Sequence, residues 1–367
     1  MDFILEGKMK KLLFSAYSLD VGGIEKALVT LVNKLDEIGY DITIVLEKKQ
    51  GVFLKEINQD IKIIEYRPNA NKNILLRKFF NLINRIRFVI KYKNKFDFSA
   101  CFATYSISSS FVSRIASKNT CLWGHADYLT LFENNRDEVE KFFLKRKCEQ
   151  FKHIIFVSEE GKKSFLSVFP NLKDRAIKCN NLINAKKIID MSNEKINIER
   201  NKELVTFLNV GRHDEKQKRL TRIIEASKKL VQDNLKFKVL FVGDGPDNKL
   251  YKDLVKKENL EENIIFFGAK ENPYPYFKIS DCVILTSDYE GYPVVFLESF
   301  TLDKPIITTK VSDYEEIEEK YGYVVEKNVD DIYRRMKMFI EKGYKIKEKF
   351  DAEAYNKNII KTLEKIF

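Results

Sequence analysis

The sequence lacks several features that would place it in a well-defined class of protein. Its five cysteines lie far apart and form no CxxC pair, so they supply neither a disulfide framework nor a zinc site, and they fit a reducing compartment. No segment approaches the roughly 18 uninterrupted apolar residues of a membrane-spanning helix. The first residues, MDFILEGKMKKLLF, are not expected to form a signal peptide, because Glu6 and three lysines interrupt the apolar run. We therefore expect a cytoplasmic protein, either soluble or peripheral on the inner face of the cytoplasmic membrane.

Dinucleotide-binding and repeat signatures are also missing. The glycines of FVGDGPD, Gly243 and Gly245, do not form a GxGxxG motif, so a nicotinamide-dependent dehydrogenase is not favoured and a simple turn is one interpretation of this stretch. The chain has no solenoid repeat and no low-complexity tract.

What the sequence does contain is enough apolar material for two domains. It has 367 residues, of which 44% are hydrophobic. The net charge of +11 is unevenly distributed: residues 1–180 contain 31 Lys and Arg against 21 Asp and Glu, a net of +10, and the rest of the chain contributes +1. The basic excess of the first half indicates an anionic surface or partner for that half.

Strands and helices alternate along both halves of the chain. Apolar runs typical of buried strands occur at 10–19, 40–46, 61–66, 96–103, 119–125 and 153–158, and again at 203–212, 237–245, 263–269, 281–287 and 304–310. Helical spacing occurs at 24–38, 219–232, 247–258 and 293–302. The alternation predicts the α/β class, with two Rossmann-like, doubly wound domains that face a deep cleft between them.

The polar, Asn-rich segment 179–203 marks the expected domain boundary. We predict a first domain over residues 1–183 and a second over residues 184–344. A final helix at 345–367 is expected to pack back on the first domain.

The loops that follow the strands are the expected ligand sites, because helix N-termini offer free N–H groups there. In the first such loop, SLDVGGIEKA, Gly22 and Gly23 allow the backbone to approach a phosphate or an acceptor closely. A purely structural turn is an equally open interpretation.

Two cations follow the strand at 203–212. Arg212 ends it, and Lys218 comes six residues later, near the start of the next helix. Arginine binds a diphosphate in a bidentate way and lysine acts as a point charge, so the pair suits such a ligand. The alternative is a solvated basic helix start. Cations at a helix N-terminus oppose the helix dipole, however, which favours ligand binding.

The stretch LTSDYEGYPVVFLES, residues 285–299, supplies two carboxylates after another strand. Glu290 falls in the loop, Pro293 suits the first turn of the following helix, and Glu298 falls inside that helix. A loop carboxylate can accept hydrogen bonds from sugar hydroxyls. A carboxylate in an apolar helix is costly unless it has donors such as ribose hydroxyls. The pair can therefore hold different parts of a nucleotide-sugar, with ordinary helix decoration as the alternative.

Several stretches together resemble a known family. GGIEKALVTLVNKL, VGRHDEKQKRLTRIIEA, VGDGP, NPYPYFKISDCVILTSDYEGYPVVFLES and KPIITT are similar to the retaining glycosyltransferases of family 4, which have the GT-B fold. Glu290 and Glu298 match the E-x7-E motif of that family, including its Gly-x-Pro flank. The resemblance covers nearly all of the second half and the first loop of the first half, and the rest of the first half is only loosely similar.

The resemblance implies a donor-binding second domain and an acceptor-binding first domain. Arg212 and Lys218 resemble the pair that neutralises the donor diphosphate. Glu298 resembles the carboxylate on the ribose, and Glu290 the one that faces the transferred sugar. The donor is also expected to contact the following residues: Gly22, Gly23, Gly243, Gly291, Tyr292 and Pro293.

The stretch LWGHADY holds the candidates from the first domain. His125 resembles the active-site histidine of the family, and with Glu290, Arg212 and Lys218 it completes the expected catalytic set. Asp127 and Tyr128 are candidates for acceptor binding, and for Asp127 a plain loop acid is the alternative.

The implied reaction transfers a hexose or N-acetylhexosamine from a nucleotide-sugar, with retention at the anomeric carbon. A UDP-sugar is the expected donor. The acceptor would be a lipid-linked or membrane-associated glycan of bacterial capsule, O-antigen or exopolysaccharide synthesis. No DxD-like motif stands out, and two cations with helix N-termini can stabilise the leaving diphosphate, so no metal or other cofactor is expected. The alternatives are a transferase with a soluble acceptor, and an inactive subunit that only binds nucleotide-sugar.

A basic amphipathic segment occupies residues 72–95. It has eight Lys and Arg and no acidic residue, and its apolar residues recur at near-helical spacing. Such a segment suits an anionic membrane surface. The alternative is a helix whose apolar face belongs to the core of the first domain. Nucleic acid is not favoured as a partner, because no nucleic-acid motif accompanies the charge.

Overall fold

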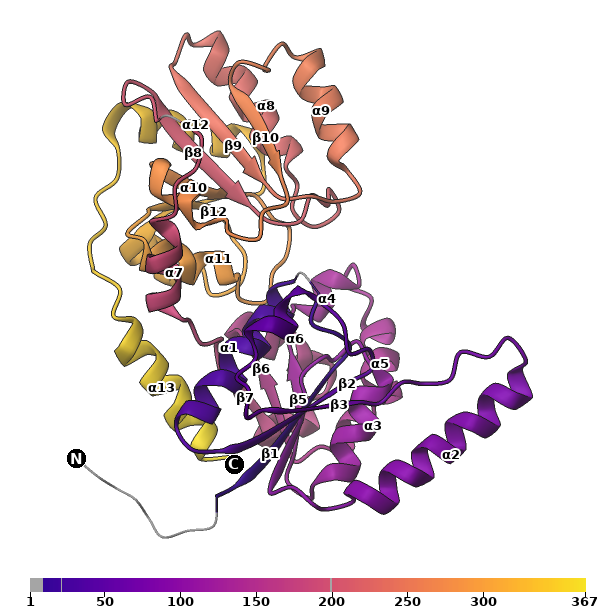
Figure 1. Ribbon diagram of the computed structural model, residues 1–367. Coiled ribbons are helices and arrows are strands. Elements are labelled where there is room, and N and C mark those ends of the chain that lie inside the picture. The colour runs from indigo at the N-terminus through magenta and orange to yellow at the C-terminus, as the bar shows by residue number, and fades with distance from the viewer. Residues whose placement is uncertain (1–8, 21, 199) are drawn as a thin grey trace, which may run out of the picture. The chain divides into compact units, whose positions relative to one another are not determined.

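The computed structural model describes residues 9–367 except residues 21 and 199. The N-terminal stretch MDFILEGKMKKLLF, which is not expected to be a signal peptide, lies partly outside these residues. The chain divides into two compact units (Figure 1). Unit 1 comprises Met1–Leu182 and Tyr355–Phe367, and unit 2 comprises Ile183–Ala354. The division thus lies one residue before the boundary expected between residues 183 and 184.

Unit 1 contains a seven-stranded parallel sheet in the order β3-β2-β1-β4-β5-β6-β7. Its strands are β1 Lys11–Ala16, β2 Asp41–Leu46, β3 Lys62–Glu65, β4 Phe98–Cys101, β5 Thr120–Gly124, β6 His153–Phe156 and β7 Ala176–Lys178. Its α-helices are α1 Gly23–Glu37, α2 Ile74–Tyr92, α3 Ile107–Ala116, α4 Tyr128–Leu131, α5 Arg136–Lys145, α6 Glu159–Val168 and α13 Ala352–Glu364, the last of which begins in unit 2.

Unit 2 repeats this arrangement with a six-stranded parallel sheet in the order β10-β9-β8-β11-β12-β13. Its strands are β8 Val205–Val210, β9 Phe237–Val242, β10 Ile264–Gly268, β11 Cys282–Leu285, β12 Ile306–Thr309 and β13 Gly322–Val325. Its helices are α7 Ala185–Ser192, α8 Thr221–Gln232, α9 Asn248–Lys257, α10 Tyr274–Ile279, α11 Val294–Thr301 and α12 Val329–Lys342.

In each sheet the first strand lies in the interior, and successive strands are added first on one side of it and then on the other. This change of side lies between β1 and β4 in unit 1 and between β8 and β11 in unit 2, where the paired strands are parallel neighbours. Because parallel strands end at the same edge, the loops after β8 and β11 leave the sheet side by side. The two predicted doubly wound α/β domains are confirmed, and ligands bind at this switch point in sheets of this type.

The central strands are long apolar runs because both faces of each sheet are covered. Leu12, Leu13 and Phe14 of β1 are completely buried, as are Phe207 and Leu208 of β8. Two short edge strands were not predicted from the sequence. β7 consists of three residues, Ala-Ile-Lys, and β13 opens with a glycine in Gly-Tyr-Val-Val, so neither presents an apolar run long enough to recognise.

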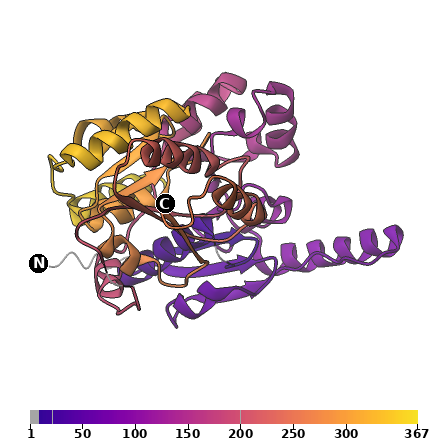
Figure 2. The ribbon, with the colours of Figure 1, turned by 90° about the horizontal axis from the view of Figure 1, so that it is seen from above.

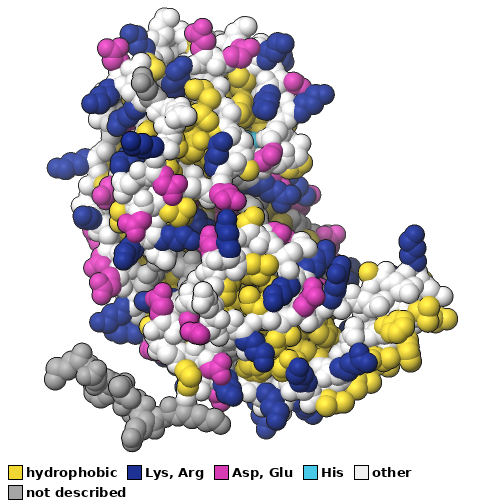
Figure 3. Space-filling view, in the orientation of Figure 1, with side chains coloured by type: hydrophobic (Ala, Val, Ile, Leu, Met, Phe, Trp, Pro, Cys, Tyr) yellow, Lys and Arg dark blue, Asp and Glu magenta, His cyan; other side chains and the backbone are white. Residues whose placement is uncertain are grey.

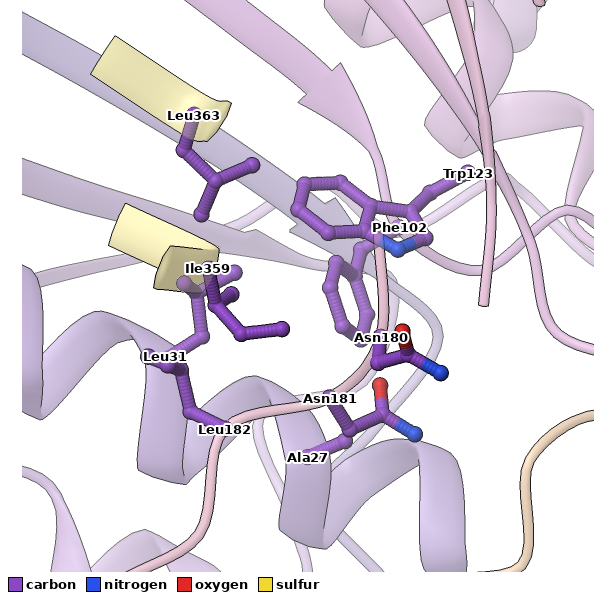
Figure 4. Close-up of a pocket in the computed structure, with 9 residues that line it drawn as sticks. All are labelled: Ala27, Leu31, Phe102, Trp123, Asn180, Asn181, Leu182, Ile359 and Leu363. Atoms are coloured by element: carbon purple, nitrogen blue, oxygen red, sulfur yellow. The ribbon is translucent and has the colours of Figure 1, made fainter. Parts of the chain in front are cut away.

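Helix α13 begins at Ala352, later than the predicted start at residue 345, and its contacts lie in unit 1. The Tyr355 hydroxyl donates to the Asn181 carbonyl at 3.1 Å, and the ring of Phe367 lies 4.8 Å from that of Phe98. Ile359 and Leu363 of α13 point toward Trp123 around a cavity of about 10 Å³ (Figure 4). That volume is comparable with the space that one water molecule needs.

Two sequence-based expectations concern redox state and membranes. All five cysteines are buried and free. None of the described helices is both long and apolar enough to cross a bilayer.

Truncating Leu363 tests how strongly α13 stabilises unit 1. Leu363→Ala should lower the free energy of unfolding by about 2–5 kcal/mol, because it enlarges an existing cavity at a fully buried position. Urea denaturation followed by circular dichroism measures this. The exposed neighbour Lys361→Ala is the control and should change stability little. Equal stability of the two variants would contradict the assigned packing.

Candidate active site

The loop after β8 packs tightly against the loop after β9. A Cβ at Gly243 would lie 1.8 Å from the Gly211 carbonyl oxygen, and one at Gly245 would lie 2.1 Å from that of His213. The His213 amide donates to the Asp244 carbonyl at 2.9 Å. Close backbone approach therefore explains the two glycines of VGDG. Donor contact by Gly243 stays a prediction.

Arg212 and Lys218 both lie in the loop between β8 and α8, but their environments differ. Arg212 is exposed, and its guanidinium pairs with no acidic side chain in the described part of the chain. Lys218 is partly buried, and its Nζ lies 2.5 Å from Oε1 of Glu290. Of the two residues predicted to bind the diphosphate, Arg212 thus has no acidic partner in the described residues. The other, Lys218, is paired with Glu290, which is predicted to bind the sugar.

Glu290 lies in the loop after β11 and is 7% exposed. Besides Lys218, its carboxylate accepts hydrogen bonds from Ser287 Oγ at 2.7 Å and from Gln217 Nε2 at 3.4 Å. A nearly buried carboxylate requires such partners, because desolvation of an unpaired charge is costly. The structure therefore brings Lys218 and Glu290 together, although 72 positions separate them in sequence.

Asp288 ties the same two loops together and was not recognised from the sequence. Its carboxylate pairs with Arg219 Nε at 2.5 Å and with an Arg222 guanidinium nitrogen at 2.7 Å. Burial alone would raise the pKa of Asp288, but hydrogen bonds from the two arginines outweigh it and lower that pKa. Two cations of the basic helix start are thus structural. The one available signal was an acidic residue close behind an apolar run, because Asp288 follows β11 by three residues.

Glu298 lies in α11 and is 3% exposed, so the helix-decoration interpretation is wrong. Its Oε1 accepts a hydrogen bond from the hydroxyl of Tyr274, in α10, at 3.1 Å. Sequence reasoning did not identify Tyr274, which is far from both glutamates along the chain. The two carboxylates therefore occupy separate positions, one in the loop and one in the helix.

The Gly291-Tyr292-Pro293 turn connects these two positions. Pro293 is extended, with φ −60° and ψ 120°, and stands immediately before α11 instead of in its first turn. No side chain caps the helix N-terminus. Tyr292 is buried, and its hydroxyl donates to Glu316 Oε2 at 3.3 Å. The turn thus leaves the first N–H groups of α11 available for a ligand, whereas donor contact by Gly291, Tyr292 and Pro293 stays a prediction.

Gly22 and Gly23 lie in unit 1, at the start of α1. A Cβ at Gly22 would lie 2.1 Å from Oε2 of Glu25, whose other carboxylate oxygen accepts a hydrogen bond from the Tyr105 hydroxyl at 3.0 Å. Burial raises the pKa of Glu25. Glycine at position 22 therefore leaves room for this carboxylate, and a contact with the donor remains a prediction.

His125 directly follows β5 and is half-buried. Its ring lies 4.5 Å from that of Phe102, and its Nε2 is shielded from solvent with no hydrogen-bond partner in the described residues. Burial lowers the pKa of His125 to about 3, against the opposing effect of a hydrogen bond with the Phe102 backbone. The imidazole is therefore neutral at pH 7, with one ring nitrogen unused by the protein.

Asp127 and Tyr128 have structural roles in unit 1. The Asp127 carboxylate caps α4, where it accepts hydrogen bonds from the backbone N–H of Leu129 at 3.1 Å and of Thr130 at 3.4 Å. Tyr128 is buried, with its ring 4.8 Å from that of Phe143. These contacts account for both residues without an acceptor, and acceptor binding by them stays a prediction.

The pKa of His125 gives a testable pH dependence. Its ring should stay neutral from pH 8 down to about pH 4, whereas an ordinary histidine protonates near pH 6.5. The unfolded chain takes up this proton first, so the contribution of His125 to stability should be lost progressively as the pH falls below about 6.5. NMR titration of the imidazole signals measures this, with His125→Gln identifying the resonance. Titration of that signal near pH 6.5 would contradict the buried environment.

Parts of the chain are similar in sequence to known proteins. Residues 190–358 match the family model described as glycosyl transferases group 1. An uncharacterized glycosyltransferase of Methanocaldococcus jannaschii is 27% identical over 264 residues, which cover 70% of this chain and 57% of that protein. A Campylobacter jejuni enzyme, N-acetylgalactosamine-N,N'-diacetylbacillosaminyl-diphospho-undecaprenol 4-alpha-N-acetylgalactosaminyltransferase, is 30% identical over 41% of this chain and 43% of its own length. The chain thus spans only about half of each of these relatives.

A solved structure extends the likeness to both units. Anabaena HepE, crystallised with UDP and glucose, superposes with a TM-score of 0.79 at 16% identity, covering 97% of this chain and 100% of that one. At this identity the likeness shows the fold, which is the GT-B fold expected from the sequence. Residues 190–358 are thus similar to the glycosyl transferases of group 1, and the chain has the GT-B fold.

Proposed function

We propose that this chain is a retaining glycosyltransferase that moves a hexose or N-acetylhexosamine from a UDP-sugar to a lipid-linked or membrane-associated glycan of bacterial capsule, O-antigen or exopolysaccharide synthesis. The observation that carries the proposal is the pair of buried carboxylates, Glu290 and Glu298, of which Glu290 pairs with Lys218 of the β8 loop. The cations follow β8 and the carboxylates follow β11, and these strands are neighbours at the switch point of unit 2.

The diphosphate of the donor fits the cationic part of this site. Arg212 offers an exposed guanidinium, Lys218 a primary ammonium, and α11 an N-terminus without a side-chain cap. All three favour an anion, the last through its free N–H groups and dipole. The UDP bound to the structurally similar Anabaena protein supports a uridine nucleotide as the first donor to test.

The sugar and the ribose fit the two carboxylates. Glu298 is held by the Tyr274 hydroxyl, and we propose that its carboxylate also accepts hydrogen bonds from the ribose. Glu290 is neutralised by Lys218. When a diphosphate binds, it competes for the Lys218 ammonium, and Glu290 becomes a stronger acceptor for the hydroxyls of the transferred sugar.

The proposed reaction uses these groups electrostatically. The bond between the anomeric carbon and the diphosphate oxygen breaks, and its electron pair leaves with the diphosphate, which Arg212 and Lys218 stabilise. The acceptor hydroxyl attacks from the same face, so its proton can pass to the departing diphosphate and the configuration is retained. Glu290 orients the sugar and stabilises the positive charge that develops on it. Two cations and a helix N-terminus supply this stabilisation, so we expect transfer without a divalent metal.

The acceptor side of the proposal relies on the charge of unit 1 and on one relative. Residues 1–180 carry a net charge of +10, which suits a phosphate-containing acceptor at an anionic membrane. The Campylobacter relative is named for transfer to a sugar on diphospho-undecaprenol. We therefore propose a lipid diphosphate-linked glycan as the acceptor and a peripheral location on the inner face of the cytoplasmic membrane.

Donor binding can be measured without knowing the acceptor. UDP should raise the Tm of the wild type, because a ligand that binds only the folded state stabilises it. Arg212→Ala should weaken UDP binding by about tenfold or more, since it removes a charge-assisted contact. Differential scanning fluorimetry over a UDP series measures both, with Arg67→Ala, an exposed arginine of unit 1, as the control. Equal UDP affinity of Arg212→Ala and the wild type would remove Arg212 from the site.

Turnover tests the role of Glu290. Glu290→Gln keeps the size of the side chain but removes its charge, and it should lower the rate of UDP release from a UDP-sugar by about 10²-fold or more. The rate is measured with UDP-glucose and UDP-N-acetylglucosamine, and circular dichroism verifies the fold. The exposed carboxylate variant Glu315→Gln is the matched control and should retain activity. Full activity of Glu290→Gln would overturn the assignment.

A further inference from the structure

The apolar face of α2 is not part of the core of unit 1. The helix has 19 residues, and Phe88 is its one buried residue. Residues 74–80 are all exposed, and Leu75 and Ile90 are 78% and 77% exposed. Figures 1 and 2 show α2 extending away from the sheet of unit 1. The core-packing interpretation of this segment is therefore wrong for nearly the whole helix.

The exposed apolar side chains form one continuous stripe. They succeed one another at intervals of four, three, four and four residues: Leu75, Phe79, Leu82, Ile86 and Ile90. This spacing keeps them on one face along about 23 Å of helix. Figure 3 shows hydrophobic side chains gathered along α2. Exposed apolar patches of this extent mark interaction sites more often than ordinary surface.

The stripe lies on the side of α2 opposite its attachment to unit 1. Phe88 packs on Tyr66 at 5.1 Å and on Phe111 at 6.1 Å, measured between ring centroids. It stands two residues from both Ile86 and Ile90, which is about 200° around the helix axis. The helix is thus anchored through its C-terminal half, and its apolar stripe is turned to the outside.

The N-terminal half of α2 is held in helical form without packing on the core. Asn73 caps it by accepting hydrogen bonds from the amides of Leu75 at 2.9 Å and Leu76 at 3.3 Å. Asn81 accepts a hydrogen bond from the Asn69 amide at 2.7 Å and thereby fixes the preceding loop to the helix. The stripe is therefore presented on a preformed helix.

Cations flank the stripe on both sides. By helical spacing, Lys78 lies on one flank, and Arg87 and Lys91 lie on the other. Arg85 instead lies over the ring of Phe111 on the attached side, 5.3 Å from the ring centroid. No acidic residue occurs between Glu65 and Asp97 in the sequence. Within the described part of the chain, the Lys and Arg of α2 form no ion pair. An apolar face bordered by exposed cations complements a surface with an apolar interior and anionic headgroups.

We propose that α2 lies in the plane of an anionic lipid bilayer, with its apolar stripe inserted among the acyl chains and its cations at the headgroups. A surface helix of this kind binds reversibly without crossing the membrane. The inference is drawn from α2 alone, without reference to donor or acceptor. It deepens the peripheral location proposed above by naming the helix that contacts the lipid. A nucleic acid is less suited to this helix, because its phosphates would bind the cations while the apolar stripe stayed exposed to water.

Vesicle flotation of the full chain tests the proposal. The wild type should float with phosphatidylglycerol-containing vesicles at low salt and should not float with pure phosphatidylcholine. Leu75→Ser combined with Phe79→Ser and Ile90→Ser should weaken binding by about tenfold or more, because it removes the inserted surface. The control carries serine at three exposed apolar positions of unit 2, namely Ile189, Val231 and Leu250, and should bind as the wild type does.

A second set of variants tests the charge. Lys78→Gln with Arg87→Gln and Lys91→Gln should weaken binding to anionic vesicles by about tenfold or more, because each cation near the surface contributes separately. The matched control carries glutamine at Lys249, Lys252 and Lys256 of α9, which is also basic and exposed. UDP-induced changes in Tm are measured on every variant, so that loss of vesicle binding and loss of donor binding are distinguished.

Insertion is measured directly with a fluorescent probe. Phe79→Trp should shift its emission to shorter wavelength with anionic vesicles and be quenched by brominated lipid, whereas Leu250→Trp should not respond. The native Trp123 is buried and supplies a constant background. Three outcomes would overturn the proposal: no flotation at low salt, unchanged binding of the serine variant, or a dimer in solution that the serine variant abolishes. The last would make the stripe an interface between copies of this chain.

Discussion

A carboxylate removed from water must be matched by a cation or by hydrogen-bond donors, and unit 2 is built around this requirement. Glu290 meets it with Lys218 and Ser287, and Glu298 meets it with the Tyr274 hydroxyl. An uncompensated charge at either position would destabilise the unit substantially. The loops that carry these partners come from three different strand exits. The same interaction therefore joins the loops of the unit and gives them a shared polar site.

Part of this site was predictable because it depends on topology. Lys218 and Glu290 are distant in sequence, but they follow β8 and β11, which parallel α/β sheets place next to each other at the switch point. The E-x7-E spacing, with Pro293 between the two glutamates, correctly separates a loop carboxylate from a helical one. The partners were not predictable. Tyr274 and Asp288 have no periodic or spacing signal, since their roles arise from side-chain contacts across elements.

In the fold, too, the elements with a sequence pattern were predictable, and the features that depend on tertiary contacts were not. Apolar runs revealed eleven strands because burial on both sheet faces demands continuous hydrophobic sequence. β7 and β13 were not predicted, because edge strands of three and four residues need no continuous hydrophobic run. The segment 72–95 shows the limit of periodicity most clearly. An apolar stripe at helical spacing has the same sequence whether it faces a core or a bilayer, and only the exposure of Leu75 and Ile90 distinguishes the two.

The charges of the two proposed sites differ in how strongly the solvent screens them. The Lys218 and Glu290 side chains are 20% and 8% exposed and lie 2.5 Å apart, so mobile ions screen their interaction little. The cations of α2 are exposed and act over distances comparable with the Debye length, about 10 Å at 0.1 M salt. Ionic strength should therefore weaken the attraction of α2 for anionic lipid long before it disturbs the paired charges of unit 2. The proposed lipid attachment would thus vary with conditions while the proposed donor site stays intact, because one depends on solvated charge and the other on buried charge.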